Sequence, residues 1–155
     1  DRLSRGLGDV YKRQIIYLNM DFVKELKKRG YRITNPREVI CNILETSGHE
    51  HFTVDKLHNL ATKEDKNIDL ATVYRTLELL EDIDIVEHMH QAHGSGIYYL
   101  KGENDNNHII CDFCKSIYDL TKETKDRINK LLVKDSNFNL INHNFIYSGV
   151  CKNCN

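Results

Sequence analysis

Hydrophobic side chains repeat at helical spacing in four segments along the first half of the chain. The segments begin at Asp21, Thr34, Thr53 and Asp69, and each of these side chains is of a type that caps the first turn of a helix. The spacing predicts four short helices. The fourth has the most regular inward stripe, formed by Leu70, Val73, Leu77 and Leu80.

Two segments of alternating polarity come next, at residues 85–90 and 97–100, and the glycine-containing stretch between them predicts a β-hairpin. Short helices followed by a hairpin are typical of the winged helix-turn-helix fold, in which the last helix enters the major groove of DNA. We therefore expect a winged-helix DNA-binding domain over residues 20–100.

The outward face of the fourth helix carries candidate DNA contacts. If its leucines point inward, the outward residues are Ala71, Thr72, Arg75 and Thr76, with Tyr74 at the flank. Arg75 can bond a guanine edge with two donors, and Thr72 and Tyr74 can touch thymine methyl groups or phosphates. An ordinary solvated helix face has the same composition, so the pattern alone leaves both interpretations open.

The last third of the chain predicts a small αβ domain at residues 108–155, after a polar linker at residues 101–107. Strands are expected at residues 108–111, 115–120 and 138–147. A helix is expected from Thr121, with Ile128, Leu131 and Leu132 facing inward. The fold class is therefore α+β, with the winged helix followed by this smaller domain.

Two Cys-x-x-Cys pairs, Cys111/Cys114 and Cys151/Cys154, have the spacing of a structural zinc site, in which four thiolates at about 2.3 Å complete a tetrahedron. The thirty-six residues between the pairs are too many for a single finger, so we expect the metal to close the αβ domain. Two independent thiol pairs are the alternative interpretation. The remaining Cys41 lies on an apolar helical face and is expected in the core. This use of cysteine indicates a reducing, cytoplasmic compartment.

Composition and charge exclude some classes of protein. No apolar run is long enough to cross a membrane, so we expect no membrane association.

Residues 1–19 show no periodicity continuous with the helical segment that begins at Asp21, and we interpret them as a non-native leader or read-through segment before Met20. The net charge of −1 gives no general attraction to nucleic acid. Residues 27–37, however, hold five basic side chains and no acidic one, which predicts a local phosphate-binding patch.

Several motifs occur in one collinear order: Arg32-Ile-Thr-x-Pro-Arg37, His51-x-Thr53, Asp69-Leu-Ala-Thr-Val-Tyr-Arg-Thr-Leu77, His108-x-x-Cys111-x-x-Cys114 and Gly149-x-Cys151-x-x-Cys154. Together they resemble the ferric uptake regulator family over essentially residues 20–155. The resemblance implies a homodimeric, metal-dependent transcriptional repressor that is not an enzyme and that controls metal uptake. Its partner would be a palindromic operator in double-stranded DNA, because a two-fold dimer presents two recognition helices about one helical turn apart.

The resemblance further implies zinc on the four cysteines and a regulatory Fe²⁺, Zn²⁺ or Mn²⁺ ion between the two domains. Such an ion would set the angle between the recognition helices. For DNA we expect base contacts from Thr72, Tyr74 and Arg75, with phosphate or minor-groove contacts from Arg32 and Lys28.

The regulatory site departs from the family pattern. His51, His108 and Asp119 match family ligands, but Tyr99 and Asn106 stand where the family has a carboxylate and a second histidine. A further family site has His143 in place, together with Asp126 or Asp105.

The hairpin offers a substitute for the missing carboxylate. If its loop is residues 91–96, His88 pairs with Tyr99 and projects from the same face. We therefore expect a regulatory site of His51, His88, His108 and Asp119, whose three imidazoles favour zinc or ferrous iron over manganese. The alternative is that His88 is a solvated wing residue, because a slip of one residue moves it to the other face.

Three other functions are compatible with parts of the sequence. The first is the peroxide-sensing branch of the same family, in which bound iron oxidises its own histidine ligands. The second is a redox switch in which oxidation of the cysteines releases zinc. The third, a zinc enzyme, is disfavoured because four thiolates leave no open coordination position and no proline precedes either cysteine pair, as a deaminase requires.

Overall fold

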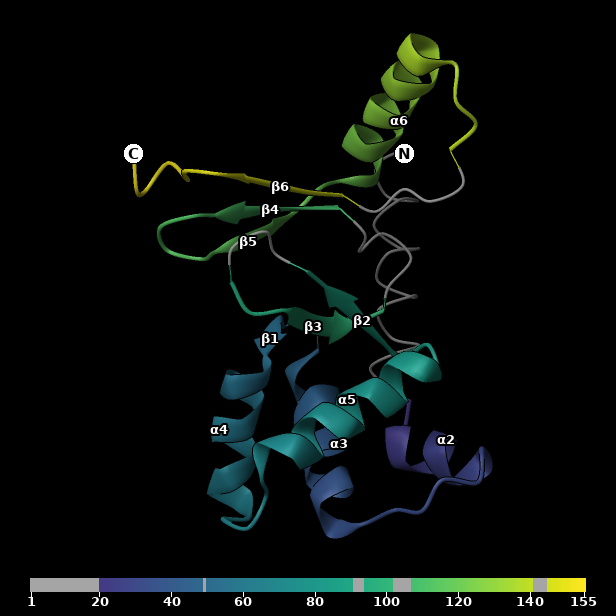
Figure 1. Cartoon of the computed structure of the whole chain (residues 1–155), viewed down its shortest axis with the longest axis vertical. Coiled ribbons are helices and arrows are strands. Elements are labelled where there is room, and N and C mark those ends of the chain that lie inside the picture. The colour runs from purple at the N-terminus through teal and green to yellow at the C-terminus, as the bar shows by residue number, and fades with distance from the viewer. Residues whose placement is uncertain (1–19, 49, 91–93, 102–106, 141–144) are drawn as a thin grey trace, which may run out of the picture. The chain divides into compact units, whose positions relative to one another are not determined.

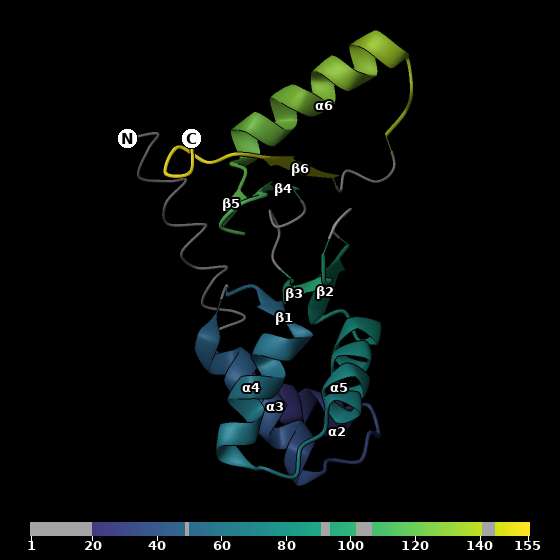
Figure 2. The same cartoon turned by 60° about the vertical axis from the view of Figure 1, so that its left-hand side comes forward.

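The computed structural model describes residues 20–48, 50–90, 94–101, 107–140 and 145–155 (Figures 1 and 2). The chain divides into two compact units at residues 102 and 103. In the described part of the chain, no helix combines the length and the apolar character needed to cross a membrane.

The first unit begins with the predicted helices, α2 (Phe22–Lys28), α3 (Asn35–Ser47), α4 (Val54–Glu64) and α5 (Leu70–Asp82). Their N-cap residues are the four that the sequence indicated. Asp21, Thr53 and Asp69 each accept a hydrogen bond from the backbone N–H three residues on, which satisfies a donor of the first turn. Thr34 makes no such bond, and Pro36 follows it early in the first turn of α3.

A three-stranded antiparallel sheet completes this unit, in the order β1 (Phe52–Thr53), β3 (Ile97–Leu100), β2 (Val86–Met89). The β2–β3 hairpin confirms the predicted wing. Strand β1 was not predicted, because two residues are too few for an alternating pattern. In the ladder Met89 lies opposite Ile97, His88 opposite Tyr98 and Glu87 opposite Tyr99. The predicted pairing of His88 with Tyr99 is therefore wrong by one residue.

The core of the first unit lies between its helices and one face of its sheet. Apolar side chains from all four helices are fully buried, and Val86, Tyr98 and Leu100 close the core from the sheet. Cys41 is fully buried, as predicted, and burial raises the pKa of its thiol to about 12. Two details of α5 differ from the prediction. Thr76 is buried and its hydroxyl donates to the Thr72 carbonyl, whereas Leu70 is partly exposed.

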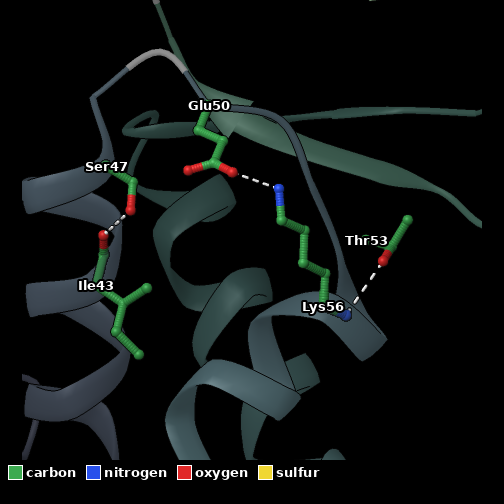
Figure 3. A network of polar contacts seen from close by, with 5 residues as sticks. All are labelled: Ile43, Ser47, Glu50, Thr53 and Lys56. Carbon is green, nitrogen blue, oxygen red and sulfur yellow. Dashed lines mark hydrogen bonds and ion pairs between the residues drawn. The ribbon is translucent and has the colours of Figure 1, made fainter. Parts of the chain in front are cut away.

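The segment between α3 and α4 is held by local polar contacts (Figure 3). The Ser47 hydroxyl donates to the Ile43 carbonyl at the end of α3. Beyond it, the Lys56 ammonium pairs with Glu50, and the Lys56 backbone N–H donates to the Thr53 hydroxyl. The contacts of Lys56 connect residues 50 and 53, which lie on either side of His51 in the sequence, to the first turn of α4.

The second unit contains β4 (Asn107–Cys111), β5 (Ile117–Asp119), α6 (Lys122–Ser136) and β6 (Phe145–Gly149), with the sheet order β5-β4-β6. Strand β4 pairs antiparallel with β5 and parallel with β6. A parallel pair needs a crossover connection, and α6 lies in that connection. Strands β5 and β6 are shorter than expected; Lys115, at the predicted start of one, instead has a positive φ of 61°.

Helix α6 differs from its prediction in the direction of its apolar side chains. No residue of α6 is buried. Leu131 is 67% exposed and Leu132 is 42% exposed, although both were expected to face inward. The apolar spacing along α6 therefore does not mark a face that is covered by the described part of the chain.

Candidate metal centres and DNA-binding surface

The four cysteines of the two Cys-x-x-Cys pairs gather at one end of the second sheet. The parallel β4–β6 register places Cys111 opposite Gly149, so the turns that come after both strands bring the two pairs together. Their Sγ atoms all lie within 4.8 Å of one another. Cys114 Sγ is 3.7 Å from Cys151 Sγ, close to the edge of about 3.8 Å in a tetrahedron with 2.3 Å metal–sulfur bonds. The donor set therefore fits a tetrahedral zinc ion.

The electrostatics of this cluster also favour a cation. Backbone N–H groups of Cys114, Cys151 and Phe113 stabilise the Cys111 thiolate and lower its pKa to about 6. Ser116 lowers the pKa of Cys114 through its hydroxyl and its backbone N–H. Hydrogen bonds with the neighbouring thiols, Cys151 first and then Cys114, hold the proton on Cys154 and raise its pKa to about 12. A divalent cation stabilises the anionic form of a thiol that coordinates it and so lets all four thiolates form.

A histidine and a carboxylate are paired in the same unit, and the histidine lies on the same strand as Cys111. His108 on β4 lies directly opposite Asp119 on β5, and its Nδ1 is 2.5 Å from Asp119 Oδ1. The His108 side chain is almost completely buried, whereas that of Asp119 is about half exposed. A carboxylate that accepts from Nδ1–H fixes the tautomer and presents Nε2 for a metal ion, which is the usual arrangement of histidine ligands.

The first unit holds a second histidine with polar neighbours. The β1–β3 register puts His51, the residue before β1, beside Tyr99, and their ring centroids are 5.1 Å apart. On the other side of Tyr99, its hydroxyl donates to Glu87 Oε2 over 2.9 Å. His51, Tyr99 and Glu87 thus form a row across the three strands, on one face of the sheet.

His88 does not belong to this row. Successive side chains of a strand point to opposite faces, so His88 lies on the face away from Tyr99. Its ring stacks on Tyr98 at a centroid distance of 4.1 Å and a plane angle of 8°. Burial, and then the neighbouring His90, lower the pKa of His88. The prediction that His88 shares a sheet face with His51 is therefore wrong. The residue that provides a carboxylate on the face of His51 is Glu87, which the sequence analysis did not identify.

The predicted DNA contacts lie on exposed surface of the first unit. Tyr74 is 45% exposed and Arg75 is exposed, both on α5, while Thr72 is partly exposed in the first turn of that helix. Lys28, at the end of α2, and Arg32, in the connection to α3, are also exposed. Arg75 and Tyr74 point outward as predicted, whereas Thr76, which was also predicted to point outward, is buried.

The second predicted metal site is incompletely described. Asp126 is exposed on α6. His143 and Asp105 lie outside the described residues, as does Asn106, one of the two departures from the family pattern.

The capped helices and hairpin of the first unit, with the cysteine centre of the second, define a winged-helix protein with a structural metal centre. A model of the Ferric uptake regulator family matches residues 28–148. The chain belongs to this family of metal-responsive DNA-binding transcriptional regulators.

Individual relatives support the same assignment. The ferric uptake regulation protein of Bacillus subtilis is 27% identical over 135 residues, covering 85% of this chain and 91% of that protein. The peroxide-responsive repressor PerR of Staphylococcus epidermidis is 32% identical over 132 residues, covering 85% of this chain and 87% of that protein. The ferric uptake regulator Fur of Helicobacter pylori, described as having three functional metal binding sites, matches with a TM-score of 0.71. It is 27% identical and covers 86% of this chain and 88% of that one.

Proposed function

We propose that this protein is a metal-dependent repressor of metal uptake, in which zinc stabilises the second unit and a separate regulatory ion controls operator binding. The observation that carries the proposal is the His108–Asp119 pair across strands β4 and β5, which belongs to the same unit as the cysteine cluster but shares no residue with it. The second unit thus contributes side chains to two chemically different metal sites. Four soft thiolates suit a permanent zinc ion, whereas imidazole and carboxylate suit an exchangeable one.

The regulatory ion takes His51 and Glu87 from the first unit and His108 and Asp119 from the second. Glu87 replaces His88 in this set because it shares the sheet face of His51 and Tyr99. Two imidazoles and two carboxylates suit Fe²⁺, Zn²⁺ and Mn²⁺ alike, so this set carries no bias against manganese. An ion with ligands from two units favours the arrangement in which those ligands meet, and its binding shifts the population toward that arrangement.

The repressor acts as a homodimer on a palindromic DNA operator in the cytoplasm, and it has no enzymatic activity. Its dimer contact is formed by the second unit, which exposes Leu131, Leu132 and Val133 on α6 and Tyr118 and Tyr147 on its sheet. Exposed apolar surface of this extent is typical of a protein interface.

The domain boundaries are 20–100 for DNA binding and 108–155 for dimerisation, joined by a linker at 101–107. The pair His143 and Asp126 provides a further metal site.

The proposal is tested by DNA binding of the zinc-saturated protein. An operator is first selected from a random duplex library, and its affinity is then measured by fluorescence anisotropy with Fe²⁺ under anaerobic conditions, with Mn²⁺ and with Zn²⁺. At least one ion should tighten binding by about 5- to 150-fold, the usual range of coupling between sites. An affinity that no ion changes would contradict a metal-dependent repressor.

The peroxide-sensing branch is the second candidate, favoured by the 32% identity to a peroxide-responsive repressor. In that branch, peroxide oxidises a histidine ligand of bound iron. Mass spectrometry of the peptides that contain His51 and His108 separates the two functions. Iron-loaded protein treated with peroxide should gain one oxygen atom on one of these histidines if it senses peroxide. The manganese-loaded control should gain none.

A further inference from the structure

The helix-turn-helix of the first unit consists of α4, the turn at residues 65–69 and α5 (Figure 1). In this motif the second helix reads the bases, so the turn decides where that helix begins and how it is directed. Hydrogen bonds to base edges weaken steeply when their donors are misdirected. The contacts that fix this turn therefore bear on DNA reading, although they lie outside the surface that meets the bases.

Asp65 fixes the first part of the turn. Its backbone carbonyl accepts from the Ile68 N–H, and one oxygen of its side chain accepts from the Asn67 N–H over 3.0 Å. The other carboxylate oxygen accepts from the side chain of Asn35, at the start of α3, over 3.1 Å. These bonds attach the beginning of the turn to α3, and the step into α5 depends on further contacts.

His58 supplies the contact that fixes the end of the turn. Its Nε2 lies 2.9 Å from the carbonyl oxygen of Ile68, ten residues further along the chain. Because a carbonyl only accepts, the Nε2–H group is the donor. The Ile68 side chain is buried in the core, whereas its carbonyl comes before the backbone bond from the Val73 N–H to the Asp69 carbonyl. His58 on α4 thus binds a carbonyl that immediately precedes the cap of α5.

Asp69, the next residue, continues this connection into α5. Its carboxylate caps the helix by accepting from the Thr72 N–H over 2.7 Å. The hydroxyl of Thr72, and then its backbone N–H, lower the pKa of the Asp69 carboxyl. The positive charges of Arg75 and then His58 lower this pKa further, because both lie near the carboxylate. His58, the cap of α5 and the proposed base-reading arginine therefore lie close together.

We propose that His58 is a positioning residue for DNA reading, which holds the Ile68 carbonyl and so fixes the start of α5 and the direction of Arg75. This inference rests on the proposed function, in which Arg75 contacts the bases of an operator. Phosphate contacts such as that of Lys28 come from α2, outside the turn, and they carry no sequence information. Loss of the His58 bond therefore weakens binding to the operator more than binding to other sequences.

The test compares His58→Leu with the wild type, both as the full zinc-saturated chain with whichever of Fe²⁺, Mn²⁺ and Zn²⁺ gives the tightest operator binding. Leucine is a good helix former that has no hydrogen-bond donor. Its preference for operator over random duplex, measured by fluorescence anisotropy, should fall by about fivefold or more, the lower limit of what one good base contact provides. The salt dependence, which reports phosphate contacts, should stay unchanged.

Two further variants make the result specific. His58→Gln should restore most of the operator preference, because the glutamine side chain carries an amide N–H that can donate to the Ile68 carbonyl. Asn59→Leu is the matched control; it makes the same change to leucine at the neighbouring, exposed position of α4 and should keep the wild-type preference. A His58→Gln protein that loses as much preference as His58→Leu would contradict a role through this hydrogen bond.

A double-mutant cycle tests whether His58 acts through Arg75. In an Arg75→Ala background, His58→Leu should change the operator preference by no more than about twofold, because the contact that it positions is already absent. The inference is overturned if His58→Leu keeps the wild-type preference, or if its loss of preference is the same with and without Arg75.

Two measurements need no DNA. Hydrogen–deuterium exchange at the Thr72 and Val73 amides should be faster in His58→Leu than in the wild type, because the start of α5 opens more often. In the wild type, nitrogen-15 NMR should show the His58 ring proton on Nε2, and a ring protonated on Nδ1 alone would overturn the inference even if His58→Leu did not fold. A wild type without any operator preference would instead contradict the proposed function, and the exchange rates would still decide whether His58 fixes the turn.

Discussion

The Tyr99 hydroxyl donates a 2.9 Å hydrogen bond to the Glu87 carboxylate, which lies directly opposite on the β2–β3 ladder. This bond orients a carboxylate on the same sheet face as His51. A tyrosine at position 99 therefore does not deprive that face of a carboxylate, because the neighbouring strand provides one.

Glu87→Gln should weaken binding of the regulatory ion by about tenfold or more, because it replaces an anionic ligand by a neutral amide. The measurement is a titration of Mn²⁺ or anaerobic Fe²⁺ into zinc-saturated protein against a competing chelator. Glu64→Gln, an exposed glutamate at the end of α4, is the control. Equal affinities of Glu87→Gln and wild type would remove Glu87 from the ligand set.

Cys111→Ser should release zinc and unfold the second unit. Structural zinc in small domains contributes roughly 10–16 kcal/mol, as much as the whole stability of a typical domain. Zinc content by metal analysis and melting by circular dichroism measure both effects. Cys41→Ala is the matched control; it lies in the core of the first unit and should keep one zinc per chain. A folded, zinc-free Cys111→Ser protein would refute the structural role.

Arg75→Ala should cost about 1–3 kcal/mol on the selected operator and relax its sequence preference, because an arginine that bonds a base edge discriminates between bases. Lys28→Ala should instead weaken all sequences alike and reduce the salt dependence by about one unit, as expected for a phosphate contact. Competition binding at several salt concentrations separates the two effects. An Arg75→Ala protein with unchanged preference would show that α5 does not read the bases.

Leu131→Asp should dissociate the dimer, because it places a charge on an apolar side chain that is 67% exposed in the single chain. Light scattering coupled to size-exclusion chromatography gives the mass directly. Lys130→Gln, at the neighbouring exposed position of α6, lowers the net charge by the same one unit and should remain dimeric. If both variants have the mass of the wild type, the dimer does not use this part of α6.

The elements that the sequence predicted well are those with local determinants. The helix starts at Asp21, Thr53 and Asp69 followed from capping side chains, and the cysteine cluster followed from the spacing that is typical of a structural zinc site. The pairing register of the hairpin was predicted wrongly because it depends on which residues form the last pair before the loop. The expected partner of Ile97 was His90, but in the structure Ile97 lies opposite Met89. That single step moved His88 to the other face and brought Glu87 to the face of Tyr99.

Helix α6 shows a different limit. The spacing of its apolar residues indicates an amphipathic helix, but spacing alone does not distinguish a face buried in its own domain from a face that meets a partner. Leu131 was assigned to the core and is exposed in the chain. Whether an apolar helix face packs in its own domain or against a partner depends on the assembly and not on the spacing of residues in the local sequence.

The central claim is that metal binding and operator binding are coupled through ligands from both units. It is tested most directly by measuring the affinity of zinc-saturated protein for the regulatory ion with and without saturating operator DNA. Linkage requires that DNA raise the metal affinity by the same factor by which the metal raises the DNA affinity. We predict equal factors in the wild type and a factor near one in His108→Ala. A metal affinity in the wild type that operator DNA leaves unchanged would contradict the account.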